Sequence, residues 1–117
     1  MASGLPRDRI KAMKAVRETG GAFVIVTDEE ILQAIPVLAR GCGVFAEPAG
    51  ASSLAGLVKA IQTGLVRPEE RIVILVTGSG LKDIPAAMRT TGRPKRIRAN
   101  LKAVEAAMDD HLHLRKR

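Results

Sequence analysis

The residue run best suited to hold a ligand is Thr77-Gly78-Ser79-Gly80, which directly follows the apolar stretch 72–76. Its hydroxyls can donate or accept hydrogen bonds, and its glycines allow backbone amides to approach a bound group closely. In parallel α/β proteins, ligands gather at the carboxyl ends of strands, where this run would lie. Its spacing is neither that of a P-loop nor that of a dinucleotide fingerprint. Chemistry alone therefore supports a ligand contact and a plain strand-to-loop turn about equally.

Glu47, which precedes Pro48, is the second candidate. A carboxylate at the end of a short extended piece could orient a ligand or a neighbouring group. Alternatively, it is an acidic residue near a helix N-terminus, where its interaction with the helix dipole contributes under ~1 kcal/mol. Spacing alone favours the second interpretation.

Other reactive side chains have weaker support. Lys82 could form a Schiff base only if burial or a cationic neighbour activated it, and the adjacent Asp83 indicates a solvated lysine instead. Cys42 has no base near it in sequence and is expected to be a small buried residue. His111 and His113 lie in a charged tail without further ligands and are expected to be solvated, so no metal site is predicted.

Hydrophobic periodicity predicts the elements that would position these residues. Continuous apolar runs at 22–26 and 71–76 favour strands, and 44–46 favours a short extended piece. Apolar residues spaced three and four apart predict helices over 8–17, 28 to about 41, 51–62 and 100–110. Thr27 and Glu30 have the spacing of a capping box at the start of the second helix.

This order of elements is typical of a parallel α/β layer with right-handed crossovers. The expected fold class is therefore α/β: a three-layer fragment of a mostly parallel sheet with flanking helices, plus a C-terminal helical tail. Residues 1–88 are expected to form the α/β part. Residues 89–117 are expected to form a basic linker and a terminal helix.

Length and composition limit the class of protein. The chain has 117 residues, enough for one compact domain, and 46% hydrophobic with 26% charged residues excludes wholesale disorder. One cysteine excludes a disulfide framework. The longest apolar runs have about five residues, far short of the ~20 that span a bilayer. Without a signal-peptide core, the expected compartment is the cytoplasm, with no membrane partner.

The net charge of +7 is concentrated at the two ends of the chain. Residues 89–117 hold nine Lys and Arg against three acids, whereas residues 19–88 hold five against seven. Such ends could bind nucleic acid, but the tail lacks the interleaved aromatic residues that stack on bases. A solvated or subunit-facing surface is the better supported interpretation.

Two long stretches, in order, resemble the C-terminal part of threonine synthases. They are 43–57, GVFAEPAGASSLAGL, and 73–83, VILVTGSGLKD. These enzymes belong to the tryptophan-synthase-β-like group of pyridoxal-phosphate enzymes, fold type II. The resemblance covers about residues 5–88. It is fairly specific for the group of enzymes, but it distinguishes threonine synthases from threonine dehydratases less well.

The resemblance implies a role in cofactor binding for the candidates named above. By it, Thr77 faces the pyridine nitrogen of pyridoxal phosphate, Gly78, Ser79 and Gly80 form the adjoining wall, and Glu47 lies close to the cofactor. A neutral hydroxyl at the nitrogen would leave the ring less strongly protonated than a carboxylate would, which tunes its use as an electron sink. The resemblance assigns no catalytic residue within this chain.

The resemblance also implies what is missing. The family's cofactor-bearing lysine, the asparagine beside the phenolic oxygen and the glycine-rich phosphate cradle lie upstream of the matching region. The chain alone is therefore expected neither to bind the cofactor tightly nor to catalyse. Its expected partner is the complementary portion of the enzyme, or a second copy. The whole enzyme would convert O-phosphohomoserine and water to threonine and phosphate.

Two other functions remain open at this point. One is a stand-alone small α/β module that binds a small ligand or regulates another protein, with the glycine-rich run 77–80 holding the ligand. The other is nucleic-acid binding through the basic termini, for which affinity would fall steeply with salt.

Overall fold

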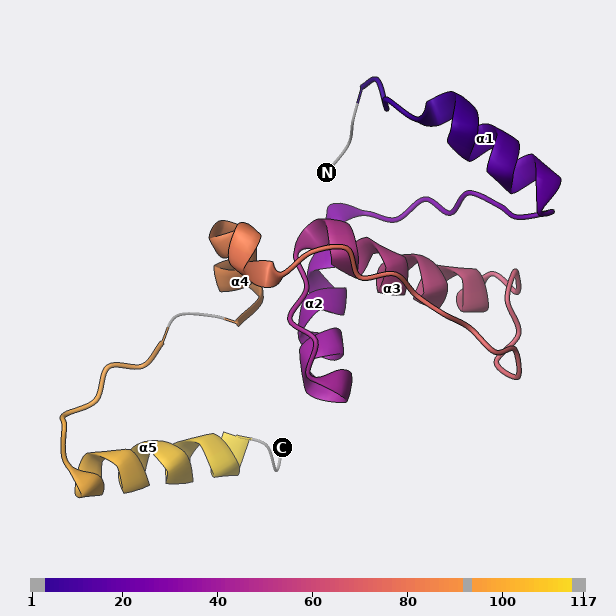
Figure 1. The fold of residues 1–117 in the computed structure, drawn as a ribbon. Coiled ribbons are helices and arrows are strands. Elements are labelled where there is room, and N and C mark those ends of the chain that lie inside the picture. Colours follow the sequence, from indigo (N-terminus) through magenta and orange to yellow (C-terminus); the bar gives the residue numbers. More distant parts are fainter. Residues whose placement is uncertain (1–3, 92–93, 115–117) are drawn as a thin grey trace.

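The structure, a computed structural model, describes residues 4–91 and 94–114, and it describes side chains as far as Asp109. Its ordered elements are all helical. They are α1 (Arg9–Glu18), α2 (Asp28–Cys42), α3 (Pro48–Gln62), the 3-10 turn η1 (Gly80–Lys82), α4 (Ile84–Thr91) and α5 (Leu101–Leu114). Figure 1 shows α2, α3 and α4 grouped in the middle, with α1 and α5 set apart.

The predicted helices are confirmed, and local sequence signals explain where they begin and end. Helix α2 starts in the predicted capping box: the Thr27 hydroxyl accepts the Glu30 N–H at 3.2 Å, and the Glu30 carboxylate accepts the Thr27 N–H at 2.7 Å. It ends at Gly43, whose φ of 71° is in the left-handed region that glycine adopts at no steric cost. Helix α3 begins at Pro48 rather than at Ala51, because proline suits the first helical position.

The predicted parallel sheet is absent from the described residues, so the α/β fold class was wrong. The runs 22–26 and 71–76 form no strand, and the β-pairing within residues 4–91 and 94–114 is an isolated antiparallel bridge between Ala46 and Ser79. Apolar β-branched residues favour an extended backbone, but a strand exists only where a neighbour supplies hydrogen-bond partners. The apolar runs therefore predicted an extended backbone correctly, but they predicted pairing into a sheet incorrectly.

The hydrophobic core lies between α2 and α3. Ile35 of α2 is 1% exposed, and it packs in a cluster with Leu38 on the same helix and with Ala51 and Ala55 of α3. Alanines on α3 allow the helices to approach closely. Helix α4 packs on α2. The core is thus formed by helices and is small for a chain of this length.

The two extended runs cover the core with one side only. Val26, Ile74 and Val76 pack against the helical cluster, whereas the alternate residues Ile25 and Val73 are 89% and 84% exposed. Phe23 and Leu75 are likewise exposed. Successive side chains of an extended segment point to opposite sides, so each run directs apolar side chains away from the core. We call these exposed side chains of the two runs, Phe23, Ile25, Val73 and Leu75, the open apolar face.

The chain as a whole is extended. Its Cα radius of gyration is 18.5 Å, whereas a compact domain of this length has a radius of about 13 Å. Helix α5 lies well away from α2 and α3 (Figure 1). In the part of the chain that the structure describes, no helix has the length and apolar character needed to cross a membrane. The division of the chain at residue 88 stays a prediction.

Candidate functional site

The candidate residues meet where the start of α3 crosses the segment 77–80. Two backbone hydrogen bonds join these parts: the Glu47 N–H donates to the Gly78 carbonyl at 3.0 Å, and the Gly80 N–H donates to the Phe45 carbonyl at 2.9 Å. They make up the isolated bridge between Ala46 and Ser79. The structure therefore brings the two candidate regions of the sequence, 47 and 77–80, into direct contact.

Gly78 and Gly80 make this contact possible because they leave room for two side chains of the facing segment. A Cβ at Gly78 would overlap the Glu47 carboxylate, and a Cβ at Gly80 would lie 2.5 Å from Phe45 Cζ. Gly50 contributes from α3, since a Cβ there would lie 3.3 Å from the Thr77 nitrogen. The glycines thus serve close packing within the chain.

Glu47 is held by a partner that the sequence did not suggest. It is the N-cap residue of α3, but its side chain makes no capping hydrogen bond. Instead, its Oε1 atom lies 3.1 Å from Lys82 Nζ. The Glu47 side chain is only 14% exposed, whereas that of Lys82 is 66% exposed. The carboxylate therefore lies at a helix N-terminus, as spacing favoured, and it is also paired with the ammonium of Lys82.

Thr77 points in the other direction. It is exposed, as are Val73 and Leu75, which precede it at intervals of two residues. The alternation places its side chain on the side opposite to the Gly78 slot that Glu47 fills. Within residues 4–91 and 94–109, its hydroxyl has no hydrogen-bond partner, whereas the Ser79 hydroxyl accepts the Leu81 N–H at 3.3 Å. Thr77 therefore continues the open apolar face with a free hydroxyl.

Of the weaker candidates, only Lys82 takes part in this contact among the described residues. Lys82 is exposed, as expected, but it has the partner described above. Cys42 is exposed, so the expectation that it is buried was wrong; its thiol donates to the Leu38 carbonyl at 3.1 Å. His111 and His113 lie outside the residues whose side chains are described. Among those whose side chains are described, no group of His, Cys, Asp and Glu could hold a metal ion.

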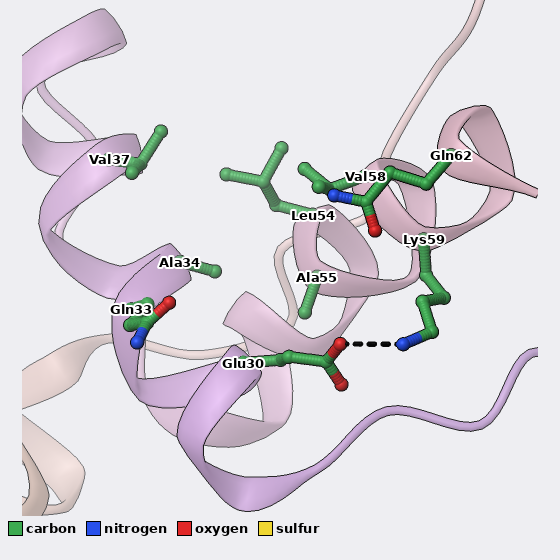
Figure 2. A pocket seen from close by; sticks show the side chains of 9 residues that line it. All are labelled: Glu30, Gln33, Ala34, Val37, Leu54, Ala55, Val58, Lys59 and Gln62. Atoms are coloured by element: carbon green, nitrogen blue, oxygen red, sulfur yellow. Dashed lines mark hydrogen bonds and ion pairs between the residues drawn. The ribbon is translucent and has the colours of Figure 1, made fainter.

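A separate groove of about 320 Å³ lies between α2 and α3 (Figure 2). Its walls include Ala34 and Leu54, and the ion pair between Glu30 Oε1 and Lys59 Nζ spans it at 2.8 Å. The hydrogen bond from Lys59, together with that from the Thr27 N–H, lowers the pKa of Glu30 to about 2. The groove is lined by none of the candidate residues. The carboxylate of Glu30 already accepts hydrogen bonds from Lys59 and the Thr27 N–H.

Residues 1–78 match the family described as pyridoxal-phosphate dependent enzyme. Because this match covers well over half of the 117 residues, the chain belongs to that family. The resemblance that the motifs indicated is thereby confirmed.

Individual relatives narrow the comparison to threonine synthases. The threonine synthase of Methanocaldococcus jannaschii is 42% identical over 107 residues, which are 92% of this chain and 26% of that protein. That of Methanosarcina acetivorans is 41% identical, over 90% of this chain and 26% of that protein. That of Mycobacterium leprae is 45% identical, over 74% of this chain and 24% of that protein. The chain thus spans about a quarter of the length of these curated relatives.

One of the residues that the resemblance assigned to the cofactor has chemistry suited to it. Thr77 presents a free, exposed hydroxyl, which is a suitable neutral partner for a ring nitrogen. Glu47 differs, since its carboxylate is enclosed and paired with a cation. Of the two polar groups that the resemblance assigned to the cofactor, Thr77 is therefore the one that is open to it.

Proposed function

We propose that this chain is the C-terminal portion of a threonine-synthase-like enzyme that forms threonine and phosphate from O-phosphohomoserine and water, and that it acts only together with the complementary portion. The proposal is supported by its similarity to threonine synthases over a quarter of their length. The observation that carries it is the position of Thr77, at the end of the open apolar face formed by Phe23, Ile25, Val73 and Leu75.

The open apolar face is where the complementary portion would lie. A soluble protein rarely leaves large apolar side chains together in water, so such a face indicates a surface that another segment covers. Thr77 would then be enclosed beside the apolar layer, where a hydrogen bond is stronger than in water. This arrangement accounts for both the exposure of Ile25 and Val73 and the free hydroxyl at the end of the same face.

Within the assembled site, the residues of this chain bind and orient. Bound pyridoxal phosphate supplies the electron sink for the reaction. The Thr77 hydroxyl would hydrogen bond to the ring nitrogen without placing a negative charge there. Gly78, Ser79 and Gly80 line the adjoining wall, and Glu47 shapes that wall from the other side of the segment.

Lys82 does not supply the amine that carries the cofactor. Such an amine is activated by burial or by a nearby cation. Lys82 is 66% exposed and is paired with a carboxylate. The lysine that carries the cofactor belongs to the complementary portion in this proposal.

Complementation tests the proposal. The chain is mixed with a threonine synthase from which the matching quarter has been removed, and threonine and phosphate formed from O-phosphohomoserine are measured. We expect turnover from the mixture and from neither part alone. Turnover by the chain alone would contradict the proposal, as would a stable complex of the two parts that binds pyridoxal phosphate and stays inactive.

A further inference from the structure

We propose that Lys82 is a positioning residue: its ammonium holds the Glu47 carboxylate in the slot beside Gly78 and so fixes the segment 77–80 against the start of α3. The inference rests on the proposed function only in saying which site that segment serves. Lys82 does not touch the cofactor in this account, because it acts through Glu47.

A single oxygen of the Glu47 carboxylate makes both contacts. Glu47 Oε1 is the atom that occupies the space where a Gly78 Cβ would be, and the same atom lies 3.1 Å from Lys82 Nζ. A carboxylate that is 14% exposed has lost most of its hydration and needs a charged partner or hydrogen-bond donors. Without the ammonium, the carboxylate gains by turning out to water, which would empty the slot and uncover the Gly78 backbone.

The chain around Lys82 holds its ammonium in reach of Glu47. Lys82 ends the turn η1, in which its own N–H donates to the Ser79 carbonyl at 3.0 Å and the Asp83 N–H donates to the Gly80 carbonyl at 3.2 Å. Asp83 does not compete for the lysine, because its carboxylate accepts the Ala86 N–H at 3.0 Å and so caps α4. The adjacent acid therefore leaves Lys82 to a carboxylate 35 residues away.

The contact that Lys82 supports is otherwise slight. The segment 77–80 is joined to the start of α3 by the two hydrogen bonds of an isolated bridge, with no further ladder on either side in the described chain. Short pairings of this kind open locally with little free energy. The Glu47 and Gly80 amides, which donate these two bonds, therefore report directly on the effect of Lys82.

Amide hydrogen exchange followed by NMR tests the inference, on the 117-residue chain alone and bound to its complementary portion. Lys82→Met keeps most of the stem and removes the charge, and Lys82→Arg keeps the charge. Lys59→Met is the matched control, since its ion pair with Glu30 lies in the groove between α2 and α3.

We expect Lys82→Met to speed exchange of the Glu47 and Gly80 amides about three- to fivefold, the upper range for an ion pair in which one partner is largely exposed. Lys82→Arg should stay within about twofold of the unaltered chain, and Lys59→Met should leave both amides unchanged. In a chain that also carries Glu47→Gln, Lys82→Met should have no additional effect, because the two residues act as one unit.

Three results at the Glu47 and Gly80 amides would overturn the inference: no change at either amide with Lys82→Met, an equal change with Lys59→Met, or a full effect of Lys82→Met in the Glu47→Gln background. Equally rapid exchange at Ile35 and Ala55 in the α2–α3 core would show a general loss of structure and would also overturn it. The measurement needs neither cofactor nor activity, so its failure is distinct from failure of the complementation that tests the proposed function.

Discussion

The ammonium of Lys82 lies 3.1 Å from the carboxylate of Glu47, 35 residues earlier in the chain. This ion pair closes a small unit in which the start of α3, the segment 77–80 and the turn η1 hold one another. Gly78 provides the space for this ion pair, because a Cβ at that position would overlap the Glu47 carboxylate. The unit gives the site two sides: a packed side with Glu47 and an open side with Thr77.

The first prediction concerns the slot at Gly78. Gly78→Ala places a Cβ on the Glu47 carboxylate and would move this side chain away from Lys82, so we expect it to lower the free energy of unfolding in urea by up to about 1 kcal/mol, the contribution of the lost ion pair. Gly56→Ala is the control, because nothing lies within 4 Å of a Cβ there. In the interior of α3 it should be neutral or stabilising by up to about 1 kcal/mol. Equal effects of the two substitutions would contradict the slot.

The second prediction concerns pH. Hydrogen bonds from Lys59 and the Thr27 N–H lower the pKa of Glu30 from 4.5 to about 2 in the folded chain. A carboxyl whose pKa is lowered by folding stabilises the fold above its unfolded pKa and ceases to do so below its folded pKa. The urea concentration at the midpoint of unfolding should therefore decrease as the pH is lowered from about 4.5 to about 2.

Glu30→Gln should weaken this fall, and Glu29→Gln, the same change of charge one residue away, should keep it. An equal pH dependence of the unaltered chain and the Glu30→Gln variant would show that the ion pair across the groove does not cause it.

The third prediction concerns covalent attachment. After incubation with pyridoxal phosphate and reduction with borohydride, the chain alone should carry no stoichiometric adduct on Lys82. The reason is that this amine is exposed and paired with Glu47 rather than buried beside a cation. Peptide mapping by mass spectrometry gives the answer, and one equivalent of label on Lys82 would refute the assignment.

The fourth prediction concerns the open apolar face. Ile25→Asp should weaken binding to the complementary portion about tenfold or more, because a charge would be enclosed in an apolar contact. It should leave the helix content of the chain alone unchanged, since Ile25 is 89% exposed. Val26→Asp is the contrasting variant, because Val26 packs on the α2–α3 core and its change should reduce helix content. Calorimetry and circular dichroism measure the two effects.

Local sequence signals were sufficient for α1, α2, α3 and α5. The Thr27–Glu30 capping box is formed by residues three apart, so its spacing alone predicted it. The sheet was wrong because strand pairing depends on segments that are distant in sequence, and the isolated bridge at Ala46 was all that formed in the described chain. Lys82 was assigned to solvent because Asp83 is its neighbour, yet that carboxylate caps α4. A pair separated by 35 residues leaves no periodic signal.

The central claim is that this chain presents Thr77 to the ring nitrogen of the cofactor, and the absorption spectrum of pyridoxal phosphate in the assembled enzyme tests it most directly. Thr77→Asp places a carboxylate at that nitrogen and would favour its protonation, so the account predicts a changed absorption maximum. Thr19→Asp, at the end of α1, should leave the spectrum unaltered. Identical spectra for both variants, with the cofactor bound, would contradict the account.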